Sequence, residues 1–145
     1  MDKYDSLKLS NQLCFPLYAT AKEIVRKYKP FLDEIDLTYT QYITMMVLWE
    51  ERKLNVKELG EKLYLDSGTL TPLLKKLESK GYISRNRSKE DERQLDVVIT
   101  EEGLNLRDKA LSIPAKLGSC VCLDESEAIA LHSALQKILN GFKED

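Results

Sequence analysis

Between residue 55 and residue 100 the sequence predicts two short helices followed directly by a β-hairpin, and few folds contain these elements in this order. Asn55 opens the run NVKELGEKLYL and Glu58 follows three residues later, which is the spacing of a capping box at a helix start. The next run, DSGTLTPLLKKLESKG, has leucines at helical spacing and a stop at Gly81. The segments YISRNR and QLDVVIT then flank the charged SKEDER and predict a two-stranded hairpin. Two tightly joined helices followed by a hairpin predict a winged helix-turn-helix.

The second helix of this pair is expected to begin near Asp66 or Ser67. Its apolar residues repeat at intervals of three and four, and they are Leu70, Leu73, Leu74 and Leu77. Pro72 lacks an N–H and its ring clashes with the carbonyl four residues earlier, so the first turn is expected to be distorted. Gly68 adds no side-chain bulk where the backbone has to bend.

A winged helix-turn-helix reads DNA with the exposed side of its second helix and with the tip of its hairpin. Small hydroxyl side chains near a helix N-terminus approach phosphates and base edges, and basic side chains add attraction to the DNA backbone. From Ser67 to Arg93 there are seven basic and four acidic residues, a local charge of +3, whereas the whole chain carries −2. Asp91 is expected to fix the guanidinium of Arg93 two residues later. The candidate DNA-binding residues are Ser67, Thr69, Thr71, Lys75, Lys76, Arg85, Arg87, Lys89, Asp91 and Arg93.

Two further helices are predicted before the winged helix. Apolar residues at helical spacing indicate a first helix from about Ser10 to Lys29, interrupted early by Pro16 and broken at Pro30. The run YTQYITMMVLWEE indicates a buried second helix, for which Thr40 is the candidate cap.

Helices are also predicted after the hairpin. Thr100 is expected to cap a helix that ends near Leu111, and Asp124 with Glu127 three residues later is a capping box for the last helix. The fold class is therefore mainly α, with six helices and a small β-hairpin.

Composition excludes several classes of protein. The 145 residues, 43% hydrophobic and 32% charged, are typical of one soluble domain. The longest apolar stretch, Ile43 to Trp49, is too short to cross a membrane, and the N-terminus lacks a signal-peptide core, so a cytoplasmic protein without a membrane partner is expected. Three cysteines and one histidine, without a Cys-x-x-Cys pair, support neither a metal site nor a cofactor.

The run from residue 65 to residue 103, with its DERQ sequence in the hairpin, resembles the winged-helix core of MarR-type bacterial transcription regulators. With LCFPLY and KYKPFLDEIDLTYTQY ahead of it, the chain resembles the organic hydroperoxide resistance regulators of that family along almost its full length. The resemblance implies a homodimeric repressor that binds a pseudo-palindromic operator in double-stranded DNA. It also implies a single domain over 1–145, with dimerisation helices at about 1–35 and 101–145. The winged helix-turn-helix is then expected at about 36–100, with the wing near 85–95.

In that branch a cysteine near the start of the first helix senses the peroxide. The resemblance therefore implies that Cys14 is the sensor, that Tyr28 and Tyr39 of the partner subunit hydrogen-bond to it, and that Tyr18 lines the same site. A thiolate is the nucleophile that attacks an O–O bond, and phenol donors stabilise the thiolate and lower the pKa of the thiol. The product is a sulfenic acid. Pro16, two residues after the sulfur, departs from the expected pattern.

The other two cysteines decide how the sulfenic acid is resolved. Members of the branch with one cysteine need an external thiol, whereas members with a second cysteine before the last helix close an intersubunit disulfide. Cys120 and Cys122 lie in that stretch, which indicates the two-cysteine type. The hypothesis is a disulfide from Cys14 to Cys120 of the other subunit, with Cys122 as the substitute and an external thiol as the remaining alternative.

Three other functions compete with peroxide sensing. A MarR-type regulator that responds to a phenolic or carboxylate ligand would make Cys14 irrelevant. A winged helix used only for protein contact would not bind a specific duplex. A thiol peroxidase is disfavoured because no acid–base set surrounds the thiol, so no catalytic residues and no enzyme activity are expected.

Overall fold

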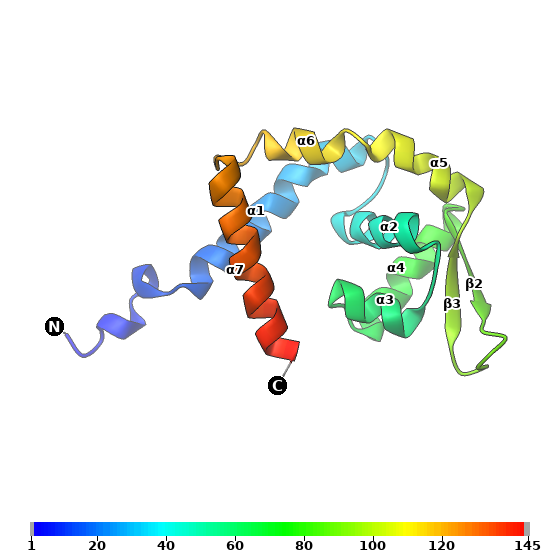
Figure 1. Cartoon of the computed structure of the whole chain (residues 1–145), viewed down its shortest axis with the longest axis horizontal. Coiled ribbons are helices and arrows are strands. Elements are labelled where there is room, and N and C mark those ends of the chain that lie inside the picture. The colour runs from blue at the N-terminus through cyan, green and yellow to red at the C-terminus, as the bar shows by residue number, and fades with distance from the viewer. Residues whose placement is uncertain (1, 144–145) are drawn as a thin grey trace.

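The computed structural model describes residues 2–143 and combines helices with one small sheet (Figure 1). Two short 3-10 helices, Asp5–Leu7 and Leu9–Asn11, come first. The helices that follow are α1 (Cys14–Asp33), α2 (Tyr39–Glu51), α3 (Val56–Leu63), α4 (Ser67–Ser79), α5 (Glu101–Ala110), α6 (Ile113–Gly118) and α7 (Glu125–Lys143). The strands are β1 (Lys53–Asn55), β2 (Ile83–Arg87) and β3 (Leu95–Ile99).

The hydrophobic core lies between α2, α3, α4 and the sheet. Met45 and Leu48 of α2 meet Leu59 of α3, and all three side chains are fully buried. α4 adds the four leucines predicted for its apolar face, all of them buried, and Val97 of β3 closes the core from the sheet side. Together these elements form the winged-helix lobe, which confirms the predicted fold class.

The sheet has three strands and not the predicted two. β2 and β3 form the expected antiparallel hairpin, and β1 pairs with the other edge of β3, which gives the order β1-β3-β2. Leu54 of β1 lies opposite Val97, and Arg85 of β2 lies opposite the same residue from the other side. A strand of three residues is too short to show an alternating pattern, and β1 runs directly into the cap of α3.

Most helix caps lie where the sequence predicted them. Asn55, Asp66 and Thr100 each accept a hydrogen bond from the backbone N–H three residues later, at 2.8, 2.7 and 3.1 Å. The capping box of Asp124 with Glu127 is also present. Thr40 as the cap of α2 was wrong, because Thr38 accepts from the N–H of Gln41 and the Gln41 side chain accepts from the N–H of Thr38.

The first helix differs from its prediction at both ends. It begins at Cys14, so Pro16 occupies the first turn, where a backbone N–H has no helical partner to lose. It continues through Pro30 to Asp33. The carbonyl that loses its partner to Pro30 belongs to Arg26, an exposed residue, so water can satisfy it. α4 likewise runs without interruption through Pro72.

Helices α5 and α6 lead away from the lobe to α7, as Figure 1 shows at the top of the molecule. α6 was not predicted, because six residues are too few to show a helical repeat. It packs against α1 and buries Ile113 and Leu117. α7 buries none of its residues. Among residues 2–143, no helix combines the length and the hydropathy needed to span a bilayer.

Candidate DNA-binding surface and thiol site

The N-terminus of α4 presents exposed hydroxyl groups beside a charged cap. Ser67, Thr69 and Thr71 are all exposed, as are Lys75 and Lys76 further along the helix. The carboxylate of Asp66 accepts the N–H of Thr69, and this hydrogen bond lowers the pKa of the Asp66 carboxyl. The cap therefore stays ionised and keeps the first turn ordered, while the helix dipole favours anions such as phosphates at this end.

The wing is shaped by hydrogen bonds within its tip. The Ser88 side chain is buried, and its hydroxyl oxygen accepts from the backbone N–H groups of Glu90 and Asp91 at 3.2 and 3.4 Å. Asp91 in turn accepts from the N–H of Arg93 and lies 3.5 Å from its guanidinium, so the expected ion pair is present. The side chain of Arg93 is 94% exposed. Arg87 and Lys89 are exposed nearby.

Arg85 lies in a different setting from the other basic residues of the wing. Its side chain is 18% exposed, and its Nη2 donates to Glu78 Oε1 at 3.0 Å. Its backbone N–H donates to the second oxygen of the same carboxylate. These hydrogen bonds lower the pKa of the Glu78 carboxyl. Arg85 therefore links the base of the wing to the end of α4. This role of Glu78 was not predicted, because no local pattern marks a partner seven residues away.

Cys14 lies at the first residue of α1, and its thiol is exposed and unbonded. Tyr18 follows one helical turn later and is 64% exposed. Both side chains therefore lie on the same face of α1, at the end of the helix that is farthest from the lobe (Figure 1).

Tyr28 and Tyr39 lie together at the other end of α1, where they form an aromatic cluster with Tyr42. The ring centroids of Tyr28 and Tyr39 are 4.9 Å apart, and those of Tyr28 and Tyr42 are 5.7 Å apart. Burial, with the neighbouring phenols, raises the pKa of Tyr28 to about 12, and burial also raises the pKa of Tyr39. These phenols stay protonated at neutral pH and remain hydrogen-bond donors.

The tyrosine cluster is out of reach of the thiol in the same chain. Cys14 and Tyr28 lie fourteen residues apart on one helix, which corresponds to about 21 Å along its axis. Of the three tyrosines predicted for the thiol site, only Tyr18, one turn later on α1, lies near the sulfur within one chain. The predicted contacts of Cys14 with Tyr28 and Tyr39 therefore require a second copy of the protein.

Cys120 and Cys122 lie just after α6, and both are exposed and not in a disulfide. The thiol of Cys120 is 3.6 Å from the carbonyl oxygen of Lys116. It borders a groove of about 340 Å³ whose other wall is the stretch of α1 from Ala19 to Lys27. Within one chain, Cys120 thus lies beside the middle of α1 and Cys14 at its start.

Comparison with known proteins identifies relatives along almost the whole chain. The family described as transcriptional regulator SarA/Rot matches residues 26–110. The organic hydroperoxide resistance transcriptional regulator of Bacillus subtilis (strain 168) is 47% identical over 138 residues. The matched region covers 95% of this chain and 94% of that protein.

Solved structures of AbfR from Staphylococcus epidermidis have the same fold. Reduced AbfR bound to DNA matches with a TM-score of 0.81 at 30% identity, over 99% of this chain and 98% of that chain. Disulfide-formed AbfR matches with a TM-score of 0.65 at 31% identity, over 94% of this chain and 96% of that chain. By TM-score, the fold is therefore more similar to the reduced, DNA-bound structure than to the disulfide-formed structure.

Proposed function

The chain belongs to the SarA/Rot family of transcriptional regulators, within the MarR-type winged-helix proteins, and on that premise we propose that it is a peroxide-controlled repressor. As a homodimer with reduced Cys14 it binds a pseudo-palindromic operator, and oxidation of Cys14 by an organic hydroperoxide releases the DNA. The observation that carries the proposal is the separation of an exposed thiol from a cluster of protonated phenols at opposite ends of α1.

A second chain would bring the two halves of this thiol site together. In an antiparallel arrangement of two α1 helices, Cys14 of one subunit lies beside Tyr28 and Tyr39 of the other. Exposed apolar side chains support such a dimer. On α1 they are Phe15, Tyr18 and Val25, with Leu13 directly before the helix, and on α7 they are Ile129, Leu131, Leu135, Ile138 and Phe142. The two lobes of the dimer then present two α4 helices to successive half-sites.

The oxidation proceeds in two steps. The Cys14 thiolate attacks one oxygen of the hydroperoxide, the O–O bond breaks, and the products are a Cys14 sulfenic acid and an alcohol. The thiol of Cys120 or Cys122 from the other subunit then attacks the sulfenic sulfur, which forms a disulfide and releases water. This bond ties α1 of one subunit to the segment before α7 of the other and turns the two lobes away from their spacing on DNA.

The test is a fluorescence-anisotropy titration of a labelled duplex that wild-type protein selects from a random-sequence pool. Cumene hydroperoxide is expected to weaken binding by wild-type protein and to leave Cys14→Ser protein bound. If Cys14→Ser protein releases the duplex as readily as the wild type, sensing by this thiol is excluded. Non-reducing gels of Cys120→Ser and Cys122→Ser proteins identify the resolving thiol, because only its loss prevents the covalent dimer.

One cavity supports the ligand-responsive alternative. A space of about 820 Å³ lies between the C-terminal end of α7 and helices α3 and α4, with Lys143 on one side and Lys57 on the other. Glu61 and Asp66 line the same space, so its charges balance, and its volume is what favours a bound ligand. This alternative requires that Cys14→Ser protein still releases the duplex when an aromatic carboxylate such as salicylate is added.

A further inference from the structure

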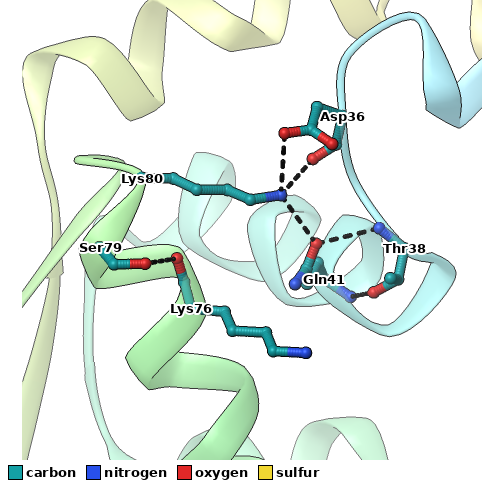
Figure 2. A network of polar contacts seen from close by, with 6 residues as sticks. All are labelled: Asp36, Thr38, Gln41, Lys76, Ser79 and Lys80. Carbon is teal, nitrogen blue, oxygen red and sulfur yellow. Dashed lines mark hydrogen bonds and ion pairs between the residues drawn. The ribbon is translucent and has the colours of Figure 1, made fainter.

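The ammonium group of Lys80, at the end of α4, contacts the turn between α1 and α2 (Figure 2). The Lys80 Nζ donates to the backbone carbonyl of Asp36, and it lies 3.5 Å from the carboxylate of the same residue. The amide oxygen of Gln41 is a third neighbour at 3.4 Å. An ammonium group has three donors, and three oxygens of the α1–α2 region surround this one.

The side chain of Gln41 connects the Lys80 contact to the start of α2. Its side chain is 4% exposed, so its amide oxygen has little access to water. That oxygen accepts from the N–H of Thr38 at 3.0 Å and from Lys80. The capping box that begins α2 and the ammonium group from α4 therefore share one buried acceptor.

Lys80 and its acceptors lie where helices begin or end. Asp36 lies three residues after the end of α1, in the left-handed region with φ of 52°, and Tyr39 of the aromatic cluster begins α2. Lys80 is the C-cap residue of α4, and Gly81 after it turns the chain toward the wing with φ of 85°. A shift of the α1–α2 turn therefore changes the acceptors available at the end of α4.

We propose that Lys80 is a positioning residue that couples the α1–α2 turn to the pose of α4 on DNA. The proposal rests on the proposed function, since it assigns to this contact the transmission of the oxidation state from the thiol site. Movement of Tyr28 and Tyr39 on oxidation displaces the turn, the three oxygens leave the ammonium group, and α4 loses the support that fixes its C-terminal end.

Burial separates Lys80 from the lysines proposed to contact DNA. Only 27% of its side chain is exposed, and its donors point at protein oxygens. Lys76, one turn earlier on α4, is exposed, and in Figure 2 its ammonium group makes no contact with the other five residues drawn. A loss of Lys80 is therefore expected to alter DNA binding through geometry and not through the loss of a phosphate contact.

The test compares Lys80→Met, Lys80→Arg and Lys29→Met with wild-type protein on the selected duplex. Lys29 is a matched control because it forms an exposed ion pair with Asp33 within α1 and lies near the same turn. Dissociation constants are measured for reduced and for cumene-hydroperoxide-treated protein over a range of salt concentrations. Thermal melting of each variant shows that the protein is folded at the assay temperature.

Lys80→Met is expected to weaken binding of the reduced protein about tenfold, which is typical of coupled contacts. The slope of log Kd against log salt stays at the wild-type value, and oxidation adds a smaller further loss than in wild type. Lys80→Arg restores binding because a guanidinium reaches the same oxygens. Lys29→Met binds like wild type in both states.

Three results would overturn the proposal. A salt slope reduced by about one in Lys80→Met would make Lys80 a phosphate contact. If Lys80→Met and oxidation each raise the dissociation constant by a factor that is independent of the other, coupling is excluded. An equal loss of affinity in Lys29→Met would exclude it as well. If cumene hydroperoxide leaves the dissociation constant of wild-type protein unchanged, the proposed function is wrong, and so is the coupling of Lys80 to oxidation. The reduced-state constants and salt slopes then still show whether Lys80 positions α4.

Discussion

The winged-helix lobe and the two long helices outside it differ in how much apolar surface one chain buries. In the lobe, Met45, Leu48 and Leu59 are fully buried. In α1 only Leu32, near the end that joins the lobe, is buried, and α7 buries no residue at all. The lobe therefore has a finished core, whereas α1 and α7 carry apolar faces without a partner.

This difference agrees with the proposal that the sensing thiol lies on α1 and not in the lobe. Full burial of a large aliphatic or aromatic side chain contributes roughly 1.5–3 kcal/mol, so several exposed apolar residues on α1 and α7 make association with a second chain favourable. Cys14 lies on that surface. In the proposed dimer, a disulfide at Cys14 would change the contact between subunits while the core of each lobe stays intact.

The largest effect is expected from Leu59→Ala in the lobe. Leu59 is 0% exposed, so its truncation leaves a cavity and lowers the free energy of unfolding by about 3 kcal/mol. Leu131→Ala on α7 is the control, because Leu131 is exposed within one chain. Urea denaturation at several protein concentrations measures both. An equally large loss for Leu131→Ala that does not depend on protein concentration would show that α7 is stabilised within one chain, as the lobe is.

A smaller effect, on association and not on the lobe, is expected from Leu135→Lys on α7. A charged group in a dimer contact is expected to raise the dimer dissociation constant about a hundredfold. Sedimentation velocity measures this constant, and circular dichroism of the variant should show the wild-type helix content. An unchanged sedimentation coefficient would place the dimer contact elsewhere.

The smallest effect is expected from Tyr28→Phe at alkaline pH. Burial raises the pKa of Tyr28 to about 12 from its ordinary value of 10.0, so the folded protein keeps a proton that the unfolded chain has lost. The corresponding stability is complete below pH 10 and declines as the pH rises toward 12. Melting temperatures of Tyr28→Phe should therefore fall less steeply over this range than those of the wild type. Tyr18→Phe, at an exposed position, is expected to retain the wild-type slope.

Local chemistry made the lobe predictable from the sequence. Asn55, Asp66 and Thr100 are cap residues whose partners lie three positions away, and the leucines of α4 repeat clearly enough to fix its buried face. The wing followed from its β-branched strands and charged tip. These features depend on short sequence separations, which is why they can be read without a structure.

Features that depend on distant residues were missed. Pro30 was expected to break α1, but the helix continues because the carbonyl that loses its partner lies on an exposed residue. β1 is recognisable only from its pairing with β3, and the ion pair of Arg85 with Glu78 needs the wing folded against α4. The roles proposed for Cys14, Tyr28 and Tyr39 came from family resemblance, since one chain does not bring them together.

The side chain of Trp49 has a practical consequence. It is the only tryptophan in the sequence, and its Nε1 donates to the carbonyl oxygen of Gly103 at 2.8 Å, which joins α2 to the first helix beyond the lobe. Its ring lies edge-on to Tyr42 at 6.3 Å. Excitation at a wavelength that the seven tyrosines do not absorb therefore gives emission from one indole, at the boundary between the lobe and α5. A shift in its emission wavelength would report, in real time, a movement of the lobe relative to α5.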